Sequence, residues 1–126
     1  MTHLVIDGMN LIGSRAGGWW RDPDRAIREL VEELEGFAQA TGEAITLVFD
    51  RRPPGYSPGT GGGLKVLFAG GGPQAADLLI ADLVREHPDP DTLLVVTSDK
   101  PLRATVEAAG ASAESVGAFR ERLEDR

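Results

Sequence analysis

The chain has 126 residues, which suits a single domain over residues 1–126 with a sizeable core, and its lack of cysteine excludes disulfides, thiolate metal sites and cysteine nucleophiles. Its formal net charge of −7 argues against nucleic-acid binding through bulk positive charge, although a nuclease whose acids gather around a cation remains compatible with it. No apolar run is long enough to span a bilayer and no signal-peptide pattern is present, so we expect a soluble cytoplasmic protein without membrane contact.

The first predicted strand contains the apolar residues 4–6 and ends on Asp7. These residues do not alternate with polar ones, as expected for a strand of a parallel sheet that helices cover on both faces. Asp7 then lies at the carboxyl end of the strand, where ligands bind in open α/β sheets. Gly8 allows a sharp turn after it, and Asn10 either occupies a plain turn or donates a hydrogen bond towards Asp7.

Residues 13–21 form a predicted exposed loop that contains two tryptophans and two arginines. Trp19 and Trp20 have two interpretations. They stack on bases beside Arg15 and Arg21, or they close over an edge of the core, as paired aromatic residues near a helix often do.

Asp22 followed by Pro23 predicts the start of a one-faced helix that continues to Gly42, because an N-cap acceptor precedes proline at the first helical position. A second apolar strand follows at residues 44–49. It also ends on an acid, Asp50, and this repetition is the informative feature.

Residues 51–63 are too rich in proline and glycine for a regular element and predict a long loop. Arg51 and Arg52 at its root either meet phosphates beside Asp50 or are ordinary surface charges. Lys65 follows this glycine run, but the residues on either side of it do not fit a phosphate-binding P-loop.

The third strand, residues 64–68, precedes a helix that begins near Pro73 and carries Asp77 in its first turn, on the side of the strand ends. The fourth strand, residues 92–97, runs into Asp99. Asp99 either caps the next helix or belongs with the other acids, and capping alone does not explain why three strands end on aspartate. A weak edge strand and a short charged helix complete the chain, at residues 113–116 and 118–126.

The predicted fold is α/β, a single three-layer domain with a mostly parallel sheet of about five strands and helices on both faces. Four carboxylates from separate segments are expected to converge at one edge of this sheet. They would repel one another unless divalent cations neutralised them, and oxygen ligands suit Mg²⁺ or Mn²⁺. The candidate ligands are Asp7, Asp50, Asp77 and Asp99.

Four motifs occur in the order V-I-D-G-M-N-L-I-G at 5–13, V-F-D at 48–50, A-D-L-L-I at 76–80 and V-T-S-D-K at 96–100. In this order and spacing they resemble the YacP-like proteins of the NYN group across nearly the whole chain. The resemblance implies a PIN-like fold and Mg²⁺- or Mn²⁺-dependent endoribonuclease activity. It assigns the four aspartates as catalytic residues and metal ligands, with Asn10 and Ser98 supporting them. The glycine- and proline-rich segment 53–63 departs from the family pattern.

Three functions compete at this point. A metal-dependent endoribonuclease acting on mRNA or at the ribosome is favoured over a non-catalytic RNA- or ribosome-binding module, because binding alone has no use for a repulsive acid cluster. A phosphoacceptor domain lacks the paired acids expected after the first strand, since Gly8 follows Asp7. RNA binding by an acidic chain needs local cations, and those expected to rim the site are Arg15, Arg51, Arg52, Lys100 and Arg103.

Overall fold

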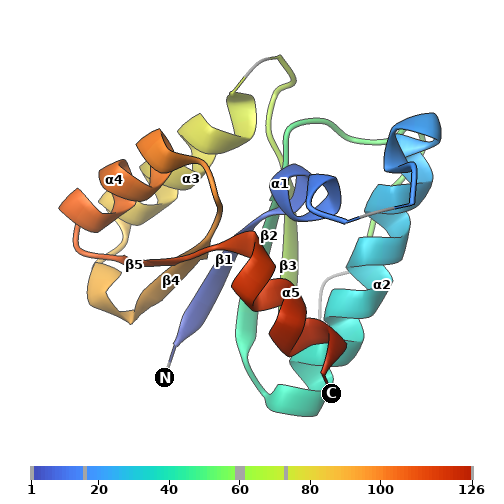
Figure 1. Ribbon diagram of the computed structural model, residues 1–126. Coiled ribbons are helices and arrows are strands. Elements are labelled where there is room, and N and C mark those ends of the chain that lie inside the picture. The colour runs from blue at the N-terminus through green and yellow to red at the C-terminus, as the bar shows by residue number, and fades with distance from the viewer. Residues whose placement is uncertain (1, 16, 59–61, 73, 126) are drawn as a thin grey trace.

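The computed structural model describes residues 2–15, 17–58, 62–72 and 74–125, and it shows one sheet between two layers of helices (Figure 1). The described strands form a parallel five-stranded sheet with the order β3-β2-β1-β4-β5. This confirms the predicted three-layer α/β class. The strands are β1 (His3–Asp7), β2 (Ala44–Phe49), β3 (Leu64–Phe68), β4 (Leu93–Val96) and β5 (Ser112–Glu114).

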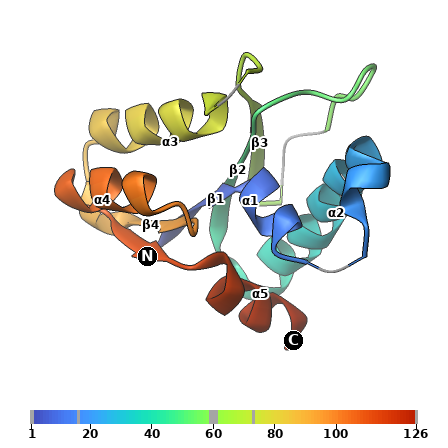
Figure 2. The same ribbon diagram turned by 45° about the horizontal axis from the view of Figure 1, so that its top comes forward.

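The helices divide between the two faces of the sheet, as Figure 2 shows from a second direction. Leu4 and Ile6 pack in the core beneath one group of helices, whereas Val5 packs in the core beneath the other. The apolar run of β1 is therefore unbroken because alternate side chains face two cores. The first group is α1 (Gly8–Gly13), α2 (Pro23–Thr41) and α5 (Val116–Glu124), and the second is α3 (Ala75–Glu86) and α4 (Lys100–Ala108).

Several predicted boundaries agree with the structure. Asp22 caps α2 by accepting a hydrogen bond from the backbone N of Arg25 at 3.1 Å, and Gly42 ends the helix with φ of 74°. Single-turn 3-10 helices occur at Trp19–Arg21 (η1) and Pro90–Thr92 (η2). Within the described residues, no helix is both long and apolar enough to cross a membrane.

Other boundaries differ from the prediction. Ser115 caps α5 through its hydroxyl, which accepts a hydrogen bond from the backbone N of Ala118 at 3.2 Å, so the last strand ends and the last helix begins earlier than expected. The predicted start of a helix at Pro73 lies outside the described residues, as do residues 59–61 of the long loop and the last residue of the predicted final helix.

The chain after Asp7 forms the helix α1 and not the sharp turn that was predicted. Asp7 caps this helix, and Gly8 is its first residue. A Cβ atom at Gly8 would lie 2.4 Å from Cε1 of Phe49, so β2 and α1 approach too closely there for any side chain. Glycine is required at this position by close packing against β2.

The strand order reverses at β1, which pairs with β2 on one side and β4 on the other. The chain builds β1, β2 and β3 outwards and then returns to place β4 beside β1. In open parallel sheets, a crevice forms outside the carboxyl ends of the strands where the order reverses. Asp7 and the loop after β4 lie at this point.

Candidate active site

Asp7 is buried at the junction of β1 and α1, with 5% of its surface exposed. Its Oδ1 accepts a hydrogen bond from the backbone N of Asn10 at 3.3 Å, and its Oδ2 accepts one from the Thr97 hydroxyl at 3.2 Å. Burial raises the pKa of Asp7 to about 6, and the negative charges of Asp77 and Asp99 add to this effect. The two hydrogen bonds act in the opposite direction.

Thr97 connects Asp7 to Asp99 through a fully buried hydroxyl. This hydroxyl donates to Asp7 and accepts a hydrogen bond from the backbone N of Asp99 at 3.2 Å. Asp99 caps α4, because its Oδ1 accepts from the backbone N of Leu102 at 2.9 Å. Thr97 was not predicted as a site residue, and the signal that could have found it is its place at the end of a buried strand, two residues before Asp99.

Asp50 and Asp77 complete the group of acids. Asp50 follows β2, and Asp77 lies in the first turn of α3. Burial raises the pKa of Asp77, and the charges of Asp99 and Asp50 raise it further, because these carboxylates face a common space. That space is a pocket of about 260 Å³, here called the acid pocket, lined by Asp7, Met9, Asn10, Asp50, Gln74, Ala76, Asp77 and Asp99.

Gln74 lines the acid pocket in an unusual backbone conformation. Its φ of 63° makes it the one non-glycine residue with positive φ within the described ranges. This left-handed conformation is unfavourable for a residue with a Cβ, and such conformations concentrate at functional sites. Gln74 is therefore a further candidate site residue, and no sequence pattern marked it.

Asn10 and Ser98, predicted to support the acids, hold neighbouring elements together. Oδ1 of Asn10 accepts a hydrogen bond from the backbone N of Ser98 at 2.8 Å, which ties α1 to the loop after β4. The hydroxyl of Ser98 accepts from the backbone N of Val116 at 3.1 Å, so this side chain contacts the start of α5. Asn10 reaches Asp7 through its backbone N–H and not through its side chain.

The five basic residues predicted to rim the site are absent from the described lining of the acid pocket. Arg15 pairs with Glu33 at 2.7 Å, and Arg51 pairs with Asp24 at 2.7 Å. Arg52 donates a hydrogen bond to a backbone carbonyl of its own loop, and its guanidinium lies 4.6 Å from the ring centroid of Phe68. Lys100 is exposed and Arg103 half-buried, both on α4 next to the Asp99 cap.

The acid pocket offers the donor chemistry of a metal site. Its carboxylate oxygens are the hard ligands that Mg²⁺ and Mn²⁺ prefer, and a cation there would relieve the repulsion that raises the pKa of Asp7 and Asp77. Among the described residues, however, no three acidic or histidine side chains already form a set that could hold an ion. The pocket therefore offers suitable oxygen donors for a divalent cation, but not a preformed ligand set among the described residues.

The expected family and fold agree with known proteins. Two crystal structures of Rae1 (YacP) from Bacillus subtilis, one of them a mutant, superpose with TM-scores of 0.77 and 0.75 at 23% and 24% sequence identity. Both matches cover 99% of this chain, and they cover 75% and 76% of those chains. This likeness confirms the PIN-like fold.

Comparison with curated protein sequences found no match. The family model of the YacP-like NYN domain, by contrast, matches residues 4–126 and so includes all four acids of the pocket. Because this match spans nearly the whole chain and agrees with the motifs at the strand ends, the chain belongs to the YacP-like NYN family of nuclease-like domains.

Proposed function

We propose that this domain is an endoribonuclease that hydrolyses RNA phosphodiester bonds at the acid pocket, with Mg²⁺ or Mn²⁺ as its cofactor. The observation that carries the proposal is the meeting of four aspartates from four separate segments in one pocket of a nuclease-like domain. Burial, with a smaller contribution from mutual repulsion, raises the pKa of Asp7 and Asp77, and perturbed acids in a cleft are typical of functional sites. Helix capping accounts for Asp7 and Asp99 but for neither Asp50 nor Asp77.

The residues of the pocket have different parts in the proposed reaction. A divalent cation, when bound, supplies positive charge to the scissile phosphate and lowers the pKa of an attacking water. Asp7 is the buried ligand, kept in place by Asn10 and Thr97. The less buried acids, Asp50, Asp77 and Asp99, are the ligands nearer to the RNA.

The test is cleavage of single-stranded and structured RNA by the purified chain, with Mn²⁺ or with EDTA. We expect Asp77→Asn to abolish cleavage. Asp82→Asn is the matched control, because Asp82 lies on the same helix but is exposed and outside the acid pocket. Cleavage that persists in EDTA, or that Asp77→Asn leaves intact, would contradict the proposal.

Metal binding is measured separately by thermal unfolding. A cation that binds only the folded state stabilises it by mass action. Mn²⁺ should therefore raise the Tm of wild type and of Asp82→Asn, and it should raise the Tm of Asp77→Asn much less. Equal shifts in all three proteins would mean that the metal binds elsewhere.

A non-catalytic RNA- or ribosome-binding module is the second candidate. It is favoured by the lack of a ready-made ligand set among the described acids, and by the pairing of Arg15 and Arg51 with acids of α2. Binding of RNA without cleavage in Mn²⁺ would support this second candidate.

A further inference from the structure

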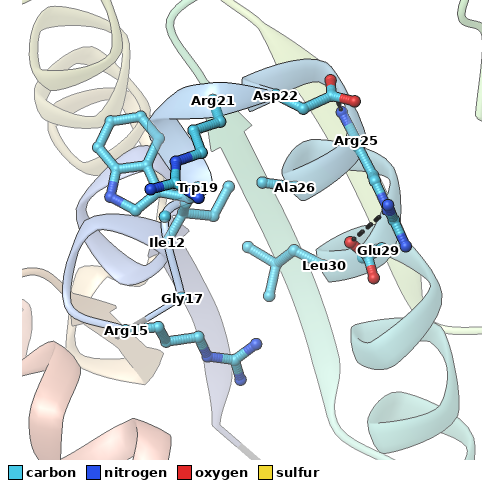
Figure 3. Close-up of a pocket in the computed structure, with 11 residues that line it drawn as sticks. Ile12, Arg15, Gly17, Trp19, Arg21, Asp22, Arg25, Ala26, Glu29 and Leu30 are labelled. Carbon is cyan, nitrogen blue, oxygen red and sulfur yellow. Dashed lines mark hydrogen bonds and ion pairs between the residues drawn. The ribbon is translucent and has the colours of Figure 1, made fainter.

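A second pocket, of about 530 Å³, lies between α1 and the start of α2 (Figure 3). Its apolar lining includes Ile12 and Leu30, both buried, together with the half-buried indole of Trp19. Its polar lining includes Arg15 and Arg21. Two acids, Asp22 and Glu29, also line the pocket, and Glu29 pairs with Arg25 at 3.4 Å. The pocket therefore combines an apolar interior and an aromatic ring with both guanidinium groups and carboxylates. We call it the tryptophan pocket.

The arginines of the tryptophan pocket are not equally neutralised. Arg15 pairs with Glu33 through both terminal nitrogens, yet its Nε is buried without a hydrogen-bond partner. Arg21 has no acidic partner within the described part of the chain. Its side chain folds back over Gly18, where an added Cβ atom would lie 3.6 Å from the Nε of Arg21. Arg21 is thus a cation without an acidic partner among the described residues at a preformed pocket, and Arg15 lies at the other end of that pocket (Figure 3).

Trp19 gives the pocket a surface for an aromatic group, and Trp20 lies next to it outside the lining. Trp19 packs against the main core, and Trp20 contacts it edge to face at 6.3 Å while remaining 62% exposed. Trp19 therefore closes over an edge of the core, as one interpretation of the sequence expects, and Trp20 presents an accessible ring, while base stacking stays a prediction. A ring that stacks beside a free guanidinium matches a nucleobase and its phosphate.

We propose that the tryptophan pocket binds one nucleotide of a single-stranded RNA, with its base against Trp19 and its phosphate on Arg21. The inference rests on the proposed function. Helix α1 has six residues, about 9 Å of helix, and it contributes Asn10 to the acid pocket and Ile12 to the tryptophan pocket. A strand that crosses α1 reaches both pockets, so the bound nucleotide positions the strand for cleavage.

Intrinsic fluorescence tests this directly, because Trp19 and Trp20 are the only tryptophans of the chain. A short single-stranded oligoribonucleotide, added with Ca²⁺ to suppress turnover, should quench the emission. Arg21→Ala should weaken binding about tenfold, as expected for one charge-assisted hydrogen bond, and reduce the salt slope by about one. Arg85→Ala is the charge-matched control, since Arg85 is exposed on α3 and outside both pockets.

Equal affinities for Arg21→Ala and Arg85→Ala, or RNA binding without a change in emission, would overturn the proposal. A nucleoside monophosphate that quenches with the affinity of the oligonucleotide would also overturn it, by assigning the pocket to free nucleotides. Quenching that depends on Arg21, with no cleavage in Mn²⁺, would support the tryptophan pocket while refuting the proposed nuclease.

Discussion

Among single residues, Asp7 makes folding stability depend on pH. A carboxyl whose pKa is raised by folding stabilises the folded state below its unfolded pKa, and this stability is lost as the pH rises through the folded pKa. For Asp7 this loss occurs between pH 3.8 and about pH 6, and the free energy of unfolding falls by about 3 kcal/mol over that range. In metal-free buffer, Asp7→Asn should exceed wild type in stability at neutral pH by up to this amount, measured by denaturant unfolding.

The advantage of Asp7→Asn should disappear as the pH falls below 3.8. Asparagine is a good N-cap, so the capping of α1 is retained. Asp22→Asn makes the same substitution at the cap of α2, outside the acid pocket, and serves as the control. If Asp7→Asn were less stable than wild type at neutral pH, the ionised carboxylate of Asp7 would stabilise the folded state, and the prediction would be wrong.

The sequence predicted the acids at the strand ends but not the residues between them. Asp7 is visible because it directly ends an apolar run, and Asp99 because it follows one after two hydroxyl residues. Thr97 joins them only because β1 and β4 are neighbours in the sheet, and the left-handed backbone of Gln74 has no signature in residue type. These two contributions depend on tertiary contacts that local patterns do not encode.

Among the elements, α1 depends most closely on a single residue. Gly8 leaves no space for a Cβ beside the buried ring of Phe49. Gly8→Ala should therefore lower the free energy of unfolding by about 1–3 kcal/mol, as overpacked cores do. Gly36→Ala is the control, because Gly36 lies within α2 with open space around it, and alanine there should stabilise the helix by up to about 1 kcal/mol.

Both variants are compared by urea unfolding. If Gly8→Ala were as stable as wild type, α1 would have room to move away from β2. Sequence patterns predicted α2 well because it is long and one-faced, and they predicted β2 and β3 because both are short, mostly apolar segments. They missed α1 because six residues bounded by glycines have too little periodicity to indicate a helix.

For the whole molecule, strand order determines which segments meet. The recurrence of acids suggested convergence, but only the order β3-β2-β1-β4-β5 brings the ends of β1, β2 and β4 to one pocket beside α3. The basic residues were harder to place. Arg15 and Arg51 pair with acids of α2 that are distant in sequence, and no local pattern shows such partners.

Charge distribution decides how this acidic protein holds RNA. Arg51 and Arg52 follow Asp50 of the acid pocket, and their ion pair and ring contact are exposed enough to yield to a phosphate. Replacing both by alanine should weaken RNA binding and make its salt dependence shallower, because fewer counterions are released. Filter binding across a salt series, with Ca²⁺ in place of Mg²⁺, measures both effects.

Replacing both arginines by lysine provides the matched comparison. Lysine keeps the positive charge but loses the planar geometry of the guanidinium, so the salt slope should stay close to that of wild type while the affinity falls only in part. Because exposed ion pairs contribute little, neither double variant should change the Tm appreciably. An unchanged affinity and salt slope in the alanine variant would exclude both arginines from RNA binding, and a partner such as the ribosome would then have to present the RNA.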